Sequence, residues 1–474
     1  MDARILSVLN GLGYKTVKED YYGHIEEWEA WYSGPVEAFH KYKIWNGTKF
    51  VHQTKMTAGM AKKVAEDWAD LCMSEKVAIT IDGKKEQAFW DEVCKETNFR
   101  IMANRFEELA FALGTTAIVA RVADLTVSKD GTVLDGGKIK FDYITARNIF
   151  PLSWENGIVT ECAFASYKYS KGVPYVYLQI HKLAEDDTYD IENRLYNAEG
   201  GSLVSVPTQS IPAFETVPDV FHTGLSEPLF VLNSPNIANS IDVTCPLGMS
   251  VYANALDQLK TVDNTFDSFN NEIILGRKRV AVQADMLGNI KGEPTFDSND
   301  VIFYFLPQDA ENGTMIKDLS SDMRIEDLYK AVQVALNALS MKCGLGANRW
   351  NFDQGSITTA TQVMSANSDA FRTLKKHELV LDGVIKSLVR IVLTLGNAFL
   401  NAGLNADAEV TVDFDDSIIE DTASEFDRDC RLLQLGVISR AELRSWYKDE
   451  SLEDAEKNLP DIIDLTEQTE PEEE

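Results

Sequence analysis

The sequence predicts an α+β protein built from several domains. Its 474 residues exceed what one compact core accommodates, which indicates roughly two to four domains. Residues 114–200 alternate short strand-forming runs with Gly, Asn and Asp, whereas the segments 248–275 and 323–343 repeat apolar residues every three or four positions. Strands and helices are therefore expected in different stretches of the same chain, as in α+β proteins.

Residues 1–247 are predicted to form a mixed body. Helical patterns cover 1–34, 54–76, about 85–97 and about 101–113, with a short strand at 77–81. Strand-forming runs follow at 115–127, 138–144, 146–152, 158–170, 173–183 and 189–197. Six prolines between residues 205 and 247 indicate an irregular, extended connection to the next helix.

The helix predicted at 248–275 carries a seven-residue apolar repeat, the period of a helix that buries one narrow stripe against neighbouring helices. The stripe consists of Tyr252, Ala255, Leu259, Val262, Phe266, Phe269 and Ile273. The opposite face, with Asn254, Asp257, Lys260, Asn264, Asp267 and Asn271, is expected to meet water. An ordinary core helix of a globular domain would show the same stripe, so this alternative stays open.

A second helix with the same period is predicted at 323–343. Its stripe is Ile325, Leu328, Val332, Ala335 and Leu339. The two helices flank a small β-containing insert at 277–322. After the second helix we expect a glycine-rich loop at 344–358, a very long helix at 359–402, a strand within 403–420 and two or three short helices at 421–459. The acidic end 460–474 is expected to be disordered.

The charge balance is strongly acidic. The net charge is −30, and residues 405–474 alone hold 23 Asp and Glu against 6 Lys and Arg. This disfavours a protein that grips nucleic acid through many phosphate contacts. It suits a surface that nucleic acid passes without sticking, and equally a merely well-solvated surface. Six scattered cysteines favour a reducing compartment, and neither a secretory signal nor a membrane span is expected.

Catalytic and metal-binding motifs are not evident. We find no Walker A motif, no G-x-S-x-G context and no metal-ligand spacing among the six histidines. Residues 413–416 resemble half of a calcium loop, but its glycine and closing Glu are missing. We therefore expect neither an enzyme nor a cofactor or metal.

Two clusters are candidates for contact with nucleic acid. Arg277, Lys278 and Arg279 form the densest basic cluster, at the end of the first heptad helix; cations that only complement a helix C-terminus are the alternative. Arg349 and Trp350 lie in the glycine-rich loop. A tryptophan that packs back on the fold is the alternative there.

The order of these segments resembles the portal proteins of tailed bacteriophages, most closely those of long-tailed phages of Gram-positive hosts. The resemblance covers most of the chain, and its weight lies in collinearity, because no single motif is diagnostic. The stretches that carry it are residues 31–34, 55–71, 108–119, 148–166, 250–280, 357–365 and 413–439.

The resemblance implies a portal fold with an α/β wing at 1–247, stem helices at 248–276 and 323–343, and a clip at 277–322. It further implies a tunnel loop at 344–358, a long wing helix at 359–402, a wing strand at 403–420 and a crown at 421–459. This crown is short compared with some relatives, which puts its role in doubt.

By the same resemblance, the protein would form a ring of twelve copies at one capsid vertex, through which double-stranded DNA enters during packaging and leaves during ejection. Implied partners are the terminase large subunit, a head–tail adaptor, and the major capsid and scaffolding proteins. DNA would pass without sequence-specific binding, and no membrane would be involved. The protein would reside in the virion, after assembly in the host cytoplasm. The alternatives are another virion structural protein, such as a minor capsid or baseplate component, or an intracellular enzyme with a site in 114–200.

Three sets of site residues follow from the resemblance. DNA-channel candidates in the tunnel loop are Asn348, Arg349, Trp350, Asn351 and Gln354. Basic candidates in the stem and clip are Arg277, Lys278, Arg279, Lys330 and Lys342. Candidates for packing of the stem, within and between subunits, are Tyr252, Leu259, Phe266, Phe269, Ile273, Leu328, Val332 and Leu339.

Overall fold

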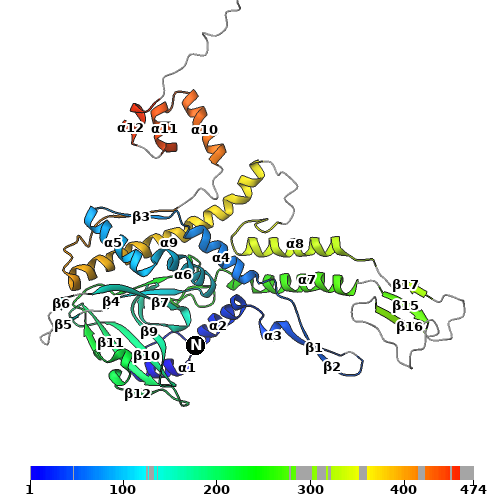
Figure 1. Cartoon of the computed structure of the whole chain (residues 1–474), viewed down its shortest axis with the longest axis horizontal. Helices are drawn as coiled ribbons and strands as arrows, with labels where there is room; N and C mark the ends of the chain where they lie inside the picture. Colours follow the sequence, from blue (N-terminus) through cyan, green and yellow to red (C-terminus); the bar gives the residue numbers. More distant parts are fainter. Residues whose placement is uncertain are drawn as a thin grey trace, which may run out of the picture. The chain divides into compact units, whose positions relative to one another are not determined.

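A computed structural model describes most of the chain, namely residues 2–45, 47–123, 126–127, 133–135, 137–276, 279–283, 302–306, 316–318, 322–351, 360–414, 422–448 and 451–459. The chain divides into two compact units, Met1–Phe414 and Asp415–Glu474. Helices and mainly antiparallel sheets occur in the first unit (Figure 1). This mixture confirms the predicted α+β class.

The N-terminal helices are shorter than predicted. Helices α1 (Ala3–Gly11), α2 (Glu19–Ser33) and α3 (Glu37–His40) replace the continuous pattern expected over 1–34. A hairpin of β1 (Lys41–Trp45) and β2 (Phe50–Thr54) follows. Helix α4 (Met60–Cys72) therefore begins six residues later than predicted, because residues 55–59 connect β2 to it.

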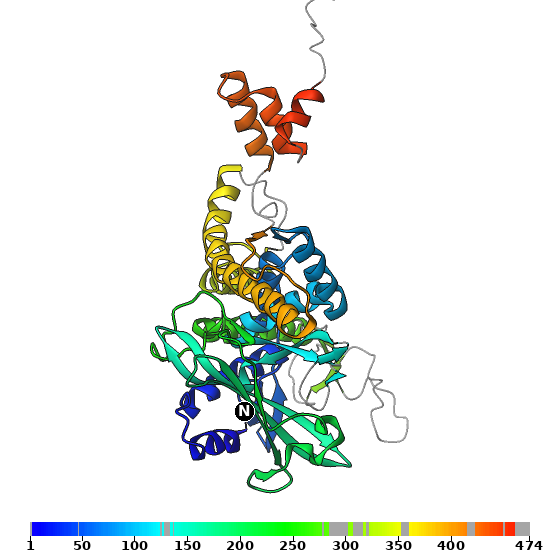
Figure 2. The same ribbon diagram turned by 90° about the vertical axis from the view of Figure 1, so that its left-hand side faces the viewer.

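Three further helices and one small sheet lie together in the first unit. Helix α5 (Lys84–Thr97) and helix α6 (Phe99–Leu113) follow strand β3 (Ala78–Ile81), which pairs with β18 (Val410–Asp413). Helix α9 (Ala360–Leu400) lies alongside α5 in Figures 1 and 2. Gly396 permits this close approach, because a Cβ there would lie 2.8 Å from the Phe89 ring.

Two antiparallel sheets form the β-rich region. The smaller one has the order β14 (Phe230–Asn233), β4 (Thr116–Ala123), β7 (Lys138–Thr145). The larger one runs β12 (Val204–Val206), β11 (Tyr189–Asn197), β10 (Val173–Leu183), β9 (Ile158–Ser170), β8 (Ile149–Glu155), and β13 (Val220–His222) also pairs with β11. A short pair, β5 (Thr126–Val127) and β6 (Val133–Asp135), lies apart from both. Single-turn 3₁₀ helices occupy Ala146–Asn148, Thr208–Ser210 and Pro212–Phe214.

The turns of the larger sheet show why the sequence folds there. Asn156 and Gly157 connect β8 to β9, and Lys171 and Gly172 connect β9 to β10, all four with positive φ. Two consecutive residues with positive φ match the type I′ turn, whose twist suits antiparallel strands.

The first heptad helix, α7, spans Leu256–Leu275 and is preceded by a 3₁₀ turn at Ala253–Ala255. The predicted start at residue 248 is therefore wrong. Hydrogen bonds to residues at and just after the end of α6 hold the preceding residues out of the helix. The Val251 N–H donates to the Phe111 carbonyl at 2.9 Å, and the Gly248 N–H donates to the Thr115 hydroxyl at 2.8 Å. A Cβ on Gly114 would lie only 2.3 Å from the Gly248 carbonyl oxygen.

The second heptad helix, α8, spans Ile325–Lys342. Between α7 and α8 the structure describes three strands, β15 (Arg279–Gln283), β16 (Ile302–Leu306) and β17 (Ile316–Asp318), in the order β16-β15-β17. β15 pairs with β16 in parallel and with β17 antiparallel. None of the helices in the described ranges has the length and apolar character of a membrane span.

The second unit is a group of three short helices, α10 (Thr422–Gln434), α11 (Arg440–Lys448) and α12 (Leu452–Lys457). Phe426 of α10 and Tyr447 of α11 meet edge to face with ring centroids 5.1 Å apart. Ala441 and Ala455 are buried between the helices. The predicted end 460–474 lies outside the described residues.

Candidate functional site

Helices α7 and α8 pair along their length to form what we call the two-helix arm. Burial along the apolar stripe of α7 decreases toward its C-terminus: Leu259 and Val262 are buried, Phe266 and Phe269 are half-buried, and Ile273 is exposed. At that far end the Arg324 guanidinium binds the Glu272 carboxylate at 2.9 Å, which lowers the pKa of Glu272. The two helices of the arm are thus buried in the body at one end, and an ion pair joins them at the other.

The residues predicted to pack the stem fall into two groups. Tyr252, Leu259, Val332 and Leu339 are buried within a single copy, so they have almost no surface left for a neighbour. Tyr252 precedes α7, and its hydroxyl donates to the Trp28 carbonyl at 2.9 Å. Phe266, Phe269, Ile273 and Leu328 retain exposed surface. A role for this second group between subunits stays a prediction.

The residues of the polar face of α7 are exposed or half-buried, as expected, but two of them also bind another segment of the chain. The Lys55 ammonium donates to the Asn264 side-chain oxygen at 2.9 Å, and the Met56 N–H donates to Asp267 at 2.9 Å. Both donors belong to the segment that leaves the β1–β2 hairpin. The hairpin is therefore fastened to the polar side of α7.

Asp263 of α7 is the central residue of this attachment. Its buried carboxylate accepts hydrogen bonds from the Ala58 N–H at 2.8 Å and from the Thr57 hydroxyl at 3.2 Å, and it lies 2.9 Å from Nε2 of the buried His40. The other ring nitrogen of His40 faces the Val36 carbonyl at 3.0 Å. One carboxylate thus joins α3, α7 and the root of the hairpin.

The described part of the predicted tunnel loop, residues 344–351, packs against the body, and we call it the docked segment. The Trp350 indole N–H donates to Asp67 of α4 at 2.8 Å, and Nε of Arg349 lies 3.4 Å from the same carboxylate. Asn348 has a left-handed backbone (φ 63°), and its side-chain oxygen accepts from Asn337 of α8 at 2.9 Å. Trp350 thus packs back on the fold, the alternative left open above.

Asp67 is buried, and the Lys63 ammonium is the third group that binds its carboxylate, at 2.8 Å. The hydrogen bond to Asp67 raises the pKa of Lys63. Replacing Asp67 with alanine should free the docked segment, because Arg349 and Trp350 lose their common acceptor. We expect trypsin to cleave after Arg349 at least about tenfold faster, and the free energy of unfolding to fall by about 1–3 kcal/mol.

Asp70→Ala is the matched control for that substitution, because Asp70 lies on the same helix, is exposed and accepts one long hydrogen bond from Asn104 at 3.2 Å. Equal cleavage rates at Arg349 in the two variants would show that Asp67 does not hold the segment. Mass spectrometry of the fragments identifies the cleavage site.

The other predicted site residues are dispersed. Lys330, Lys342 and Asn351 are exposed. Arg279 lies in β15, without a described side chain, while Arg277, Lys278 and Gln354 lie outside the described residues. The structure thus brings Arg349 and Trp350 together, but DNA contact by any of these residues stays a prediction.

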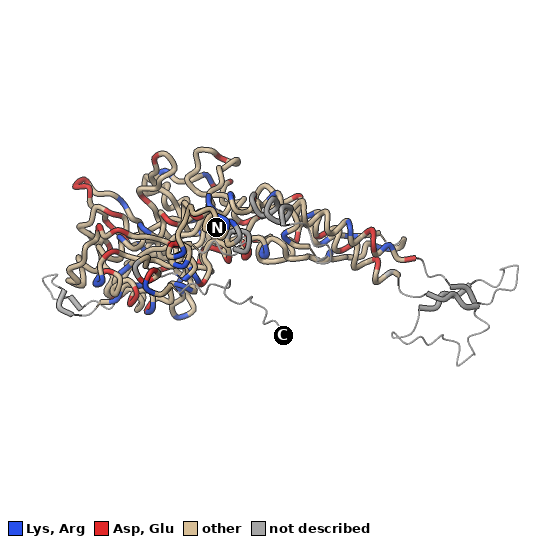
Figure 3. Tube along the Cα trace, turned by 90° about the horizontal axis from the view of Figure 1, so that it is seen from above, with Lys and Arg blue, Asp and Glu red and all other residues tan. Residues whose placement is uncertain are grey.

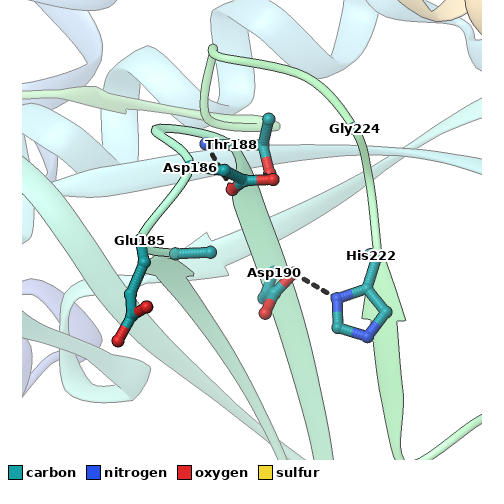
Figure 4. A pocket seen from close by; sticks show the side chains of 7 residues that line it. Glu185, Asp186, Thr188, Asp190, His222 and Gly224 are labelled. Carbon is teal, nitrogen blue, oxygen red and sulfur yellow. Dashed lines mark hydrogen bonds and ion pairs between the residues drawn. The ribbon is translucent and has the colours of Figure 1, made fainter.

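A hollow of about 370 Å³ lies beside the turn between β10 and β11 (Figure 4). Asp190 and Nδ1 of His222 are 2.6 Å apart, and hydrogen bonds from Thr188 lower the pKa of Asp186. Each of these groups is thus engaged by a neighbour in the sheet or turn. Within the described ranges, no three His, Cys, Asp or Glu side chains are grouped to hold a metal ion.

Sequence reasoning missed the hairpin and the residues that fasten it. A usable signal exists: Asn46-Gly47 lies between the strand-forming runs 41–45 and 50–54, a combination typical of a two-stranded hairpin. Asp263 and Asp67 give no such signal, because their burial depends on segments far away in the sequence.

Comparison with known proteins shows the family. The family model described as "Phage portal protein, SPP1 Gp6-like" matches residues 14–464. Among solved structures, one chain from "Neck of native GTA particle computed with C12 symmetry" is 12% identical, with a TM-score of 0.38, over 82% of this chain and 90% of that chain. No curated protein matches the chain.

The assignment rests on the family model, which covers nearly the whole chain and both units. It confirms the resemblance drawn from the order of the sequence segments. The chain therefore belongs to the SPP1 Gp6-like family of phage portal proteins.

Proposed function

We propose that twelve copies of this chain form the portal ring at one capsid vertex, the channel through which double-stranded DNA enters during packaging and leaves during ejection. The observation that carries the proposal is the family match over residues 14–464. A two-helix arm that leads into a small sheet and returns from it is consistent with this role. The ring would be assembled in the host cytoplasm and would remain in the virion.

In this proposal the two-helix arm is the stem, residues 277–322 are the clip, residues 344–358 are the tunnel loop, and the remainder of 1–420 is the wing. The clip would bind the terminase large subunit and later the head–tail adaptor, and the wing would meet the major capsid and scaffolding proteins. Helices α10 to α12 would form a short crown. The chain itself would perform no catalysis, since a separate ATPase would drive the DNA.

The charges of the arm suit a channel that DNA passes without tight binding. Acidic and basic residues are interspersed along it (Figure 3). Helix α8 carries two acids, Glu326 and Asp327, and two lysines, Lys330 and Lys342. Tight binding to a duplex needs many unopposed cations that displace its counterions, and this helix has no excess of them.

We further propose that the docked segment holds the first part of the tunnel loop against the body. The Arg349 side chain keeps 37% of its surface exposed although it lies beside Asp67. It therefore retains surface for one phosphate contact. Because Asp67 is close by, this contact should be weaker than that of an isolated arginine.

Native mass spectrometry of the purified chain tests the proposal. Twelve copies of a 53.0 kDa chain should give an assembly of about 640 kDa with cyclic symmetry, visible as rings with a central hole by negative-stain electron microscopy. As a matched comparison, Phe266→Asp places a charge on the half-buried stripe of α7 and should prevent rings. A wild-type chain that remains a monomer at micromolar concentration would refute the proposal.

A further inference from the structure

One face of the β1–β2 hairpin is exposed at every position. The strand register places Lys41 opposite Thr54, Lys43 opposite His52, and Trp45 opposite Phe50. Residues opposite each other in an antiparallel pair share a face, and all six are exposed. The alternate face is less open, since Tyr42 and Val51 are half-buried.

The tip of this face is aromatic. Trp45 is 55% and Phe50 is 65% exposed, and their rings meet edge to face at 5.2 Å. A two-stranded hairpin is marginally stable in water, and this one has no third strand among the described residues. Large aromatic side chains gathered at such a tip indicate a surface that another molecule covers.

The hairpin is also basic in an acidic chain. Residues 41–55 contain four lysines and one histidine and no Asp or Glu, although the whole chain carries a net charge of −30. Its partner should therefore combine apolar surface with negative charge.

Helix α8 offers apolar surface on its outer face and two acids in its first turn. Val334 is 68% and Met341 is 65% exposed, and both lie on the side of the helix opposite the buried Val332 and Leu339. The exposed Asp327 lies on the same outer side, toward the start of the helix, and Glu326 lies next to Asp327. Two exposed lysines accompany them: Lys330 is on this face and Lys342 adjoins Met341.

The two surfaces occupy opposite sides of the arm. The root of the hairpin binds Asn264 and Asp267 on the polar face of α7, away from the apolar stripe that carries Val262. In Figure 1, α7 lies between α8 and the hairpin. Two different surfaces on opposite sides of one subunit are what a head-to-tail ring contact requires.

We propose that the hairpin of each copy docks on the outer face of α8 in the neighbouring copy, with Trp45 and Phe50 against Val334 and Met341. The proposal rests on the ring assembly proposed above and names one contact that holds it. Lys43, on the same face of the hairpin as Trp45 and Phe50, would then face the acidic start of α8. Each copy would give one hairpin and accept one.

Site-specific photo-crosslinking in the full chain tests this contact. The photoreactive residue p-benzoylphenylalanine replaces Phe50, and irradiation of assembled rings should give a ladder of covalent dimers and higher multimers. Peptide mapping should place the new bond within residues 325–342 of the other copy. The same residue in place of Tyr169, which is 78% exposed on β9, is the control and should give no bond to α8.

A variant with both Trp45→Ser and Phe50→Ser gives a second readout. Because both side chains are exposed, the subunit should fold, as circular dichroism can verify, but half-assembly should need at least about tenfold more protein. Tyr169→Ser should leave this concentration unchanged.

The outcomes separate this contact from ring assembly itself. The docking proposal would be overturned if the wild-type chain forms rings but the probe at position 50 bonds only to its own chain, to another surface or to added DNA. The proposal of a ring would still stand in that case. A wild-type chain that forms no ring overturns both proposals. Bonds to α8 of a second copy, together with weaker assembly of the double variant, support the contact.

Discussion

Replacing Asp263 with alanine should lower the free energy of unfolding by about 3–5 kcal/mol. The carboxylate is buried and serves the Ala58 N–H, the Thr57 hydroxyl and the His40 ring. Alanine would leave the buried His40 ring and the half-buried Thr57 and Ala58 donors without their acceptor. An unpaired buried donor costs more than the lost hydrogen bond alone contributes, because its desolvation is no longer offset.

Urea unfolding followed by tryptophan fluorescence measures this loss. Asp257→Ala is the matched control, because Asp257 lies on the same helix with 87% of its side chain exposed and forms an ion pair with the nearby Lys260. The free energy of unfolding of Asp257→Ala should stay within about 0.5 kcal/mol of the wild-type value, since exposed ion pairs contribute little. Similar losses in the two variants would show that the Asp263 contacts do not stabilise the fold.

The same substitution should act on the hairpin before it acts on the body. Asp263 fixes residues 57–58 at the root of the hairpin. Its loss should therefore let the backbone at Lys43 and Lys55 open and be cleaved by trypsin at urea concentrations where the body is still folded. If the hairpin docks on a neighbouring copy, Asp263→Ala should also weaken ring assembly, without any change in the docking surfaces themselves.

Periodicity predicted the long helices well, for a physical reason. A helix such as α8 packs one apolar stripe against its neighbour, so its sequence shows the period directly. The helix predicted at 323–343 is observed at Ile325–Lys342. The start of α7 could not be found in this way. Tyr252 continues the apolar spacing, yet the chain before it is held by Phe111 and Thr115, more than a hundred residues earlier.

The candidate site was predictable only in part. The composition of 344–358 indicated a loop with one arginine and one tryptophan, but their common partner, Asp67, lies 282 and 283 residues away. Nothing in the local sequence distinguishes Asp67 from the exposed Asp70 on the same helix. The hairpin differs, since its Asn46-Gly47 signal lies in the local sequence.

A second large effect is expected from pH. His181 is buried between Phe164 and Phe230, with ring centroids 5.5 and 5.4 Å away, and no described group is within hydrogen-bond distance of either ring nitrogen. Burial lowers the pKa of His181 to about 3. His377 behaves similarly: the Asn236 N–H donates to its Nδ1 at 3.0 Å, Nε2 has no partner among the described residues, and burial lowers its pKa to about 4.

Proton linkage gives the direction in which stability changes with pH. An unfolded histidine takes up its proton near pH 6.5, whereas the folded chain resists protonation at these two positions until pH about 3 to 4. The stability due to the neutral rings is therefore complete above pH 6.5 and is lost as the pH falls below it. At pH 5 the loss should be about 2 kcal/mol for each histidine, or about 4 kcal/mol for both.

Glu107 changes the stability with pH in the opposite direction, so its contribution must be distinguished from that of the two histidines. Burial raises the pKa of Glu107 to about 7, although the Asn233 amide donates to it at 2.5 Å. An unfolded glutamate ionises near pH 4.5, so this group costs stability as the pH rises from 4.5 to 7, and acidification removes part of that cost. The wild-type pH profile alone is thus a sum of opposing contributions.

Comparison of variants resolves that sum. The loss of unfolding free energy between pH 8 and pH 5 should be smaller by about 2 kcal/mol in His181→Leu than in the wild type, because only the titration of residue 181 is removed. Packing changes caused by leucine are the same at both pH values and cancel in the difference. His52→Leu, at an exposed position of β2, should keep the wild-type difference. An unchanged pH dependence in His181→Leu would mean that the ring at 181 is protonated in the folded chain or reaches water, and the neutral core contact would have to be abandoned.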